Sequence, residues 1–181
     1  IKLKKKTYIV DQGKWIIDKP LILPKGYNLK IMPNTEIEFT ENSYIYINEG
    51  YLSSVGTKNN PIILKPNHKF WGGIFVSDSK NQKSQIKYNK IIGTNFFKHK
   101  AINLTGGLNF YRSDVEITKT DIFNSYAEDA LNFIQSNFMI KDSTFANHKS
   151  DAIDSDFSNG KIINVIFDII NNDAIDTSGS K

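Results

Sequence analysis

The motif Asp129-Ala130-Leu131-Asn132 returns as Asp151-Ala152-Ile153-Asp154 and as Asp173-Ala174-Ile175-Asp176, each time after 22 residues. Phe123, Phe145 and Phe167 recur at the same step. A fixed period of this length in strand-forming sequence is typical of a solenoid, in which each repeat stacks on the previous one. Equivalent residues of successive coils then lie roughly 4.8 Å apart, the spacing of paired strands. We therefore expect the aspartates to form rows along one face.

The remainder of the chain also has the pattern of short strands and turns. Its apolar runs are short, rich in Ile, Val, Phe and Tyr, and interrupted by Gly, Asn, Asp or Pro, and no segment has the periodicity of an amphipathic helix. The expected strands are 15–17, 21–23, 28–31, 36–39, 44–47, 51–55, 62–64, 74–76, 86–88, 102–104 and 115–118, followed by two strands in each repeat. A sandwich or barrel would also contain many short strands. The regular step and the recurrence of like residues favour in-register parallel stacking instead.

We therefore predict an all-β fold, a right-handed parallel β-helix of roughly seven to eight coils, as a single domain over residues 1–181. Residues 1–26 are a candidate N-terminal cap. The chain begins at Ile1 and stops in mid-repeat at Lys181, which we interpret as a processed form or a fragment. An open last coil would expose unpaired backbone and a row of Ile and Phe side chains. We expect further coils or another polypeptide to cover it.

Composition narrows the functional classes. Hydrophobic residues make up 39% and charged residues 23% of the 181 residues, as in an ordinary globular protein. No stretch approaches the roughly 20 apolar residues of a membrane span, and the absence of Cys excludes disulfides and thiolate metal sites. The net charge of +4 divides into +8 for residues 1–90 (15 Lys, 7 Asp or Glu) and −4 for residues 91–181 (7 Lys, 1 Arg, 12 Asp or Glu). The lysines are scattered among strands, which does not favour nucleic-acid binding.

Nearly the whole chain also resembles a known family, with the Asp-Ala-Ile-Asp repeats similar to its later coils and the most specific motifs in the N-terminal half. Asn28–Phe39 is similar to the "L-x-I-x-P-G-T-x-I-x-F" coil of bacterial right-handed β-helix proteins, with Asn34 in the usual place of Gly. Residues 51–57, 61–64 and 71–74 then follow their "G-x-L-x-x-x-G-T…P-I-x-F…W-G-G-I" order. The resemblance implies the pectin-lyase-like superfamily and a secreted or cell-surface location in a bacterium, with any signal peptide upstream. This superfamily includes polysaccharide lyases, hydrolases, epimerases, phage tailspikes and surface proteins without known activity, so it does not select one function.

The repeated acidic residues are the first candidate site. If Leu131, Ile153 and Ile175 point into the core, then Asn132, Asp154 and Asp176 point outward, and Asn103 is expected to continue their row. Stacked carboxylates repel one another, so a bound Ca²⁺, raised pKa values, nearby Lys side chains or hydrogen bonds from turn N–H groups should offset the repulsion. The candidate Ca²⁺ ligands are Asp129, Asp151, Asp154, Asp156, Asp173 and Asp176. The simpler interpretation is that Asp recurs because it caps backbone N–H groups at the turns.

The only arginine marks the second candidate site. Arg112 ends the stretch 105–112, which we interpret as an insertion because Ala101-Ile102 precedes Ala130-Leu131 by 29 residues rather than 22. Phe110 or Tyr111 could stack on a sugar while Arg112 binds a carboxylate. The simpler alternative is a loop whose aromatic residues cover the core.

Three functions remain open. A structural or glycan-binding module, with an extended face suited to a polysaccharide, explains regular repeats without a complete catalytic constellation. A Ca²⁺-dependent lyase or an epimerase on acidic polysaccharide would use Asp154, Asp176 and Arg112 as catalytic residues, with Asn103, Asn132, Phe110 and Tyr111 binding substrate. A scaffold would dock another protein on the open coil edge and would self-associate when isolated.

Overall fold

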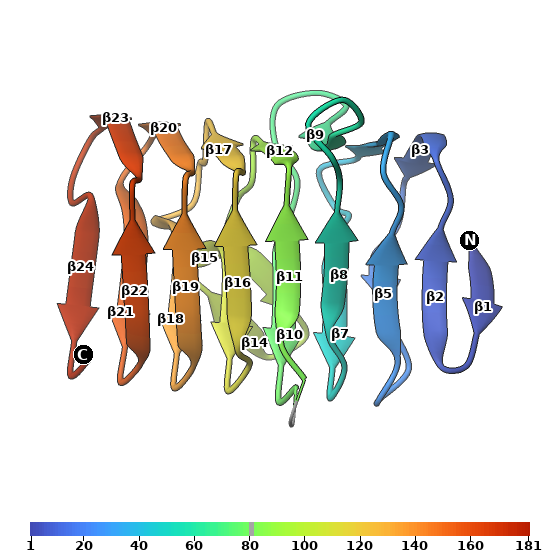
Figure 1. The fold of residues 1–181 in the computed structure, drawn as a ribbon, viewed down its shortest axis with the longest axis horizontal. Helices are drawn as coiled ribbons and strands as arrows, with labels where there is room; N and C mark the ends of the chain where they lie inside the picture. The colour runs from blue at the N-terminus through green and yellow to red at the C-terminus, as the bar shows by residue number, and fades with distance from the viewer. Residues whose placement is uncertain (80–81) are drawn as a thin grey trace.

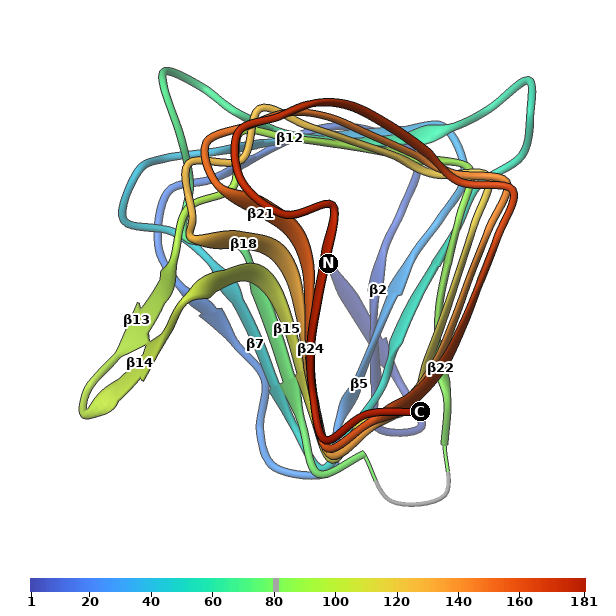
Figure 2. The ribbon, with the colours of Figure 1, turned by 90° about the vertical axis from the view of Figure 1, so that its left-hand side faces the viewer.

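The computed structural model, which describes residues 1–79 and 82–181, is a parallel β-solenoid of seven coils (Figure 1). The described residues form strands, turns and loops without a helix, and so contain no helix long and apolar enough to cross a membrane. Each coil contributes one strand to each of three parallel sheets, which we call A, B and C. Viewed from its C-terminal end, the chain passes counter-clockwise from sheet A to B to C as it approaches the viewer (Figure 2), so the coil is right-handed. The predicted all-β solenoid is confirmed.

The strands follow one another in strict rotation among the three sheets. Sheet A contains β2 (Thr7–Val10), β5 (Asn28–Ile31), β8 (Leu52–Val55), β11 (Ser84–Lys87), β16 (Val115–Thr118), β19 (Asn137–Lys141) and β22 (Asn159–Ile163). Sheet B contains β3 (Gly13–Ile17), β6 (Thr35–Phe39), β9 (Ile62–Pro66), β12 (Asn89–Ile92), β17 (Asp121–Phe123), β20 (Thr144–His148) and β23 (Ile166–Ile170). Sheet C contains β4 (Leu21–Ile22), β7 (Ile45–Asn48), β10 (Ile74–Ser77), β15 (Gly106–Tyr111), β18 (Asp129–Ile134), β21 (Asp151–Asp156) and β24 (Ile175–Ser178). Coil 1 therefore holds β2 to β4, and coil 7 holds β22 to β24.

The core is a stack of like side chains inside the three sheets. In sheet C, Leu131 lies in register with Ile153, which lies in register with Ile175. The rings of Phe110 and Phe133 stack with centroids 5.9 Å apart. Because alternate residues of each strand point inward, the repeated apolar positions of the sequence become continuous columns.

Serines and left-handed residues form the corner between sheets C and A. In coils 4 to 7, the residue that directly follows the sheet C strand has a positive φ; these residues are Arg112 (48°), Gln135 (51°), Phe157 (49°) and Gly179 (64°). A serine follows each of them, and its backbone N–H donates to the serine Oγ of the next coil; the serines are Ser113, Ser136, Ser158 and Ser180, and all three bonds measure 3.0 Å. The corner thus satisfies its buried N–H groups without water.

The two ends of the solenoid differ. At the N-terminal end, β1 (Lys2–Lys4) pairs antiparallel with β2 and covers the edge of sheet A. At the C-terminal end, large apolar side chains of the last coils are exposed: Phe157, Ile163, Ile166, Ile169 and Ile175. An edge of this kind is suited to pairing with another coil or chain.

The predicted insertion at 105–112 is wrong. This stretch contains the whole of β15 (Gly106–Tyr111), a sheet C strand whose Leu108 and Phe110 lie in register with Leu131 and Phe133. The additional chain of coil 4 precedes β15 and folds into the antiparallel hairpin of β13 (Phe97–His99) and β14 (Ile102–Leu104). Ile102 belongs to this hairpin and Leu108 is the true counterpart of Leu131, so the 29-residue step between Ile102 and Leu131 does not measure one coil.

Candidate functional site

A row of amide and carboxylate side chains crosses the outer face of sheet C on coils 4 to 7. The strand register aligns Asn109, Asn132, Asp154 and Asp176 on β15, β18, β21 and β24. The predicted alignment of Asn132, Asp154 and Asp176 is confirmed. Its fourth member is Asn109 and not Asn103, because Asn103 belongs to the β13–β14 hairpin, opposite Lys98.

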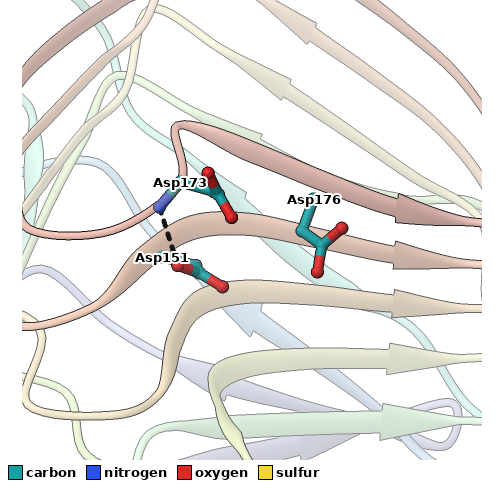
Figure 3. A group of neighbouring side chains, drawn as sticks. All are labelled: Asp151, Asp173 and Asp176. Atoms are coloured by element: carbon teal, nitrogen blue, oxygen red, sulfur yellow. Dashed lines mark hydrogen bonds between the residues drawn. The ribbon is translucent and has the colours of Figure 1, made fainter.

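A second set of aspartates lies where the chain enters sheet C. Asp129 and Asp151 are paired at the start of β18 and β21, and Asp173 lies shortly before β24. The backbone N–H of Asp173 donates to Oδ1 of Asp151 over 2.9 Å (Figure 3). The Asp151 side chain therefore supports the turn of the next coil, as the simpler interpretation of the repeat requires.

Three of the six candidate metal ligands converge. Asp151, Asp173 and Asp176 each offer a carboxylate oxygen, and these oxygens lie within 4.8 Å of one another (Figure 3). Asp173 and Asp176 are exposed, whereas Asp151 is buried. Oxygen ligands at this separation are of the type that Ca²⁺ binds, so this group could hold the ion. Asp129, Asp154 and Asp156 lie on the same sheet but outside this group of three.

The aspartates on sheet C and at its entry turns, which we call the acidic row (Asp129, Asp151, Asp154, Asp173 and Asp176), carry negative charge that no ion pair among the described residues offsets. Burial, with the nearby charges of Asp129, Asp156 and Asp176, raises the pKa of Asp154 to about 6. Burial also raises the pKa of Asp129, against hydrogen bonds from Thr105 and Asn132 that lower it. Among the described residues, no Lys or Arg forms an ion pair with either side chain. A bound cation would therefore be favoured here.

The two asparagines of the row are covered. Asn109 and Asn132 are 1% and 4% exposed, so neither presents its side chain to a ligand on the surface. The Asn132 amide Nδ2 lies 3.2 Å from Oδ2 of Asp129 and 3.2 Å from Oδ2 of Asp154. Asn132, predicted to bind substrate, instead holds two carboxylates in place. The accessible part of the row is the acidic part on coils 6 and 7.

The residues of the second candidate site are dispersed. Phe110 is fully buried in the core and cannot stack on a sugar. Arg112 is exposed at the corner after β15, where it pairs with Asp78 at 3.5 Å and lies over the half-buried ring of Tyr111, 5.6 Å from its centroid. Arg112 is three residues past Asn109 and two coils from Asp154. Strand dimensions then separate the Arg112 and Asp154 Cα atoms by roughly 14 Å, so the structure does not bring them together.

The β13–β14 hairpin covers part of the same face, a feature that the sequence did not reveal. The fully buried ring of Phe97 packs on Tyr44 and Phe75, with ring centroids 4.8 Å and 5.1 Å away. The Tyr44 hydroxyl lies 2.5 Å from Nδ1 of His99. The hairpin projects from the sheet C side of the solenoid (Figure 2) and closes the outer face over coils 2 and 3.

The sequence matches no family model and no curated protein. The architecture and the geometry of the acidic row are therefore the basis for assigning a function.

Proposed function

We propose that this chain is a secreted or cell-surface β-helix module of a bacterium, of the pectin-lyase-like type, that binds an extended polysaccharide. The order of the motifs in residues 28–74 supports the family. The straight stack of seven coils supports an extended polymer as the ligand, because similar groups recur at regular intervals along the axis of the stack (Figure 1).

One observation carries the proposal. Asp154, Asp173 and Asp176 lie at the surface of two successive coils, with no ion-pair partner among the described residues. Carboxylates accept strong hydrogen bonds from hydroxyl groups, which every residue of a polysaccharide supplies. Groups on neighbouring coils can then bind neighbouring parts of one chain.

Affinity electrophoresis tests this function. The protein is run in gels that contain neutral or acidic polysaccharides, with Ca²⁺ or with chelator. We expect one polysaccharide to retard the wild type, and the double variant Asp173→Asn, Asp176→Asn to migrate freely. Asp168→Asn, an exposed carboxylate on sheet B of the same coil, is the matched control and should be retarded like the wild type. Free migration of the wild type in every gel would refute the proposal.

A second function, a Ca²⁺-dependent lyase or epimerase on acidic polysaccharide, is favoured by the convergence of Asp151, Asp173 and Asp176. In such an enzyme these three carboxylates would hold the ion, and the ion would supply positive charge for the binding of a uronate. The position of Arg112 does not support it as the proton-abstracting base beside Asp154. Unsaturated sugar ends that form with Ca²⁺ and not with chelator would identify a lyase, and a change in uronate configuration without cleavage would identify an epimerase.

A further inference from the structure

A groove lined by three aromatic rings runs along the corner between sheets B and C. Phe70, Phe96 and Tyr126 stand on the loops that enter sheet C in coils 3, 4 and 5. The groove has a volume of about 460 Å³ and continues beside Phe70 and Phe96 into a second hollow of about 300 Å³. Phe96 is 52% exposed and Tyr126 is 36% exposed. The Phe70 and Tyr126 ring centroids are 5.9 Å apart.

These rings are not part of the core. Neither of the two buried apolar clusters includes any of the three, although the hairpin cluster contains the adjacent Phe97. None of the three recurs as an aromatic ring at the 22-residue step: Phe70 and Phe96 precede the repeats, and Tyr126 is replaced by His148 and Ile170 in the later ones, so the stacking of coils does not require a ring at these places. Neighbouring exposed aromatic side chains in a groove mark an interaction site rather than packing.

The polar lining fits a hydroxyl-rich ligand. Lys69 and Lys149 supply donors, Glu128 supplies acceptors, and Asn95 supplies both. Across the groove and its extension, three lysines face two glutamates, which leaves the formal charge close to balance. A pyranose ring has an apolar C–H face that can stack on an aromatic ring, and hydroxyls around its edge that both donate and accept hydrogen bonds. Rings and polar groups of the groove thus match the two surfaces of a sugar.

The charge beyond the groove restricts the ligand further. The lining ends at Ser150, whose Oγ lies 3.5 Å from Oδ1 of Asp151. Asp151 belongs to the three-carboxylate group with Asp173 and Asp176. When no cation is bound to these carboxylates, a polyanionic chain that lies in the groove and continues along the axis would meet them and be repelled. An uncharged chain meets no such barrier.

We propose that the corner groove binds an uncharged linear polysaccharide, with sugar rings stacked on Phe96 and Tyr126 and the chain directed toward the acidic row. This inference rests on the proposed function and names the class of glycan and the residues that hold it. The rings hold the first sugars of the chain, and the acidic row binds the hydroxyls of the sugars that follow, so both are needed for tight binding.

Titration calorimetry with defined oligosaccharides tests the groove. The probes are the uncharged hexasaccharides of β-1,4-linked glucose, mannose and xylose, and hexagalacturonate as the anionic probe. We expect at least one uncharged probe to bind, and Phe96→Ala or Tyr126→Ala to weaken it roughly tenfold. Phe157→Ala, which removes a 68% exposed ring outside the groove, should leave the affinity unchanged.

The outcomes separate the groove from the proposed function. Equal affinity of the wild type and both groove variants for a probe would refute the groove as the binding site and leave the proposal of glycan binding in place. Tighter binding of hexagalacturonate than of every uncharged probe would overturn the assignment of ligand class alone. The wild type could also bind no hexasaccharide and yet be retarded in the gel by a polysaccharide, with the retardation lost in the acidic double variant. That result would again refute only the groove as a binding site. Failure of all glycans in both experiments would remove both proposals.

Discussion

Replacing Asp154 by Asn should stabilise the fold at neutral pH. The carboxylate is half-buried beside other acids, and its pKa is raised from the ordinary 3.8 to about 6. A raised pKa means that the folded protein binds the proton more tightly than the unfolded chain. The contribution of Asp154 to wild-type stability is therefore largest below pH 4, is lost as pH rises toward about 6, and does not change above that. The amide is nearly isosteric, and its oxygen can still accept the hydrogen bond from Asn132.

The magnitude follows from the shift in pKa. A change of about two units corresponds to about 3 kcal/mol. Because Asp154 is partly exposed, solvent screening reduces the gain to about 1–2 kcal/mol. For a chain of this length, that corresponds to a rise of roughly 2–8 °C in Tm. Below pH 3.5, where the carboxyl is protonated, wild type and variant should agree within about 0.5 kcal/mol.

The assay is thermal and urea unfolding from pH 3 to pH 8 in the presence of chelator. Asp168→Asn is the control, because that carboxylate is exposed on sheet B and its replacement should leave the pH profile unchanged. Equal stability of Asp154→Asn and wild type at pH 7, with the same pH slope, would show that repulsion in the acidic row is not significant. A loss of stability at pH 7 would show that the negative charge of Asp154 is itself required for the fold.

Three further predictions concern the backbone, the ion and the open end. Gly73→Ala should lower the free energy of unfolding in urea by more than about 3 kcal/mol, because φ is +71° and a Cβ would collide with the Gly107 carbonyl. Gly26→Ala, at φ +77° in open space, should lower it by about 1 kcal/mol. Equal losses in the two variants would contradict the steric argument. If the acidic group binds Ca²⁺, millimolar Ca²⁺ should raise the Tm of the wild type but not of Asp176→Asn, and an equal rise in both would place the ion elsewhere. Ile166, 60% exposed on the last coil, should promote self-association, so Ile166→Asp should reduce the mass measured by light scattering, and a wild type that is already monomeric would contradict this expectation.

Several features of the fold could be predicted from sequence because they depend on repetition. A column of Leu131, Ile153 and Ile175 can form only if the chain returns to the same place after each step, and the observed register is the one that this requirement predicts. The same logic placed Asp154 and Asp176 in one outward row. One periodic signal was missed, namely the left-handed corner residues followed by serines, although it follows the same spacing in coils 5 to 7.

Other features could not be derived from periodicity because they arise where the repeat is broken. Two apolar segments of coil 4, one with Ile102 and one with Leu108, could each supply its sheet C strand. Only the strand pairing shows that Leu108 is in the core and Ile102 in the hairpin. Burial of Asn132 depends on contacts with Asp129 and Thr105, and alternation along a strand does not predict such contacts.

The sequence by itself determined the solenoid, the parallel in-register pairing of its strands and the acidic row, because similar residues at a fixed step pack best directly above one another. Only the tertiary structure decided that three carboxylates converge while Arg112 lies apart, and that Phe70, Phe96 and Tyr126 meet in one groove. These three rings are separated by 26 and 30 residues, and none of them recurs at the 22-residue step. Their proximity follows from the stacking of three coils, which brings together loops that share no local pattern.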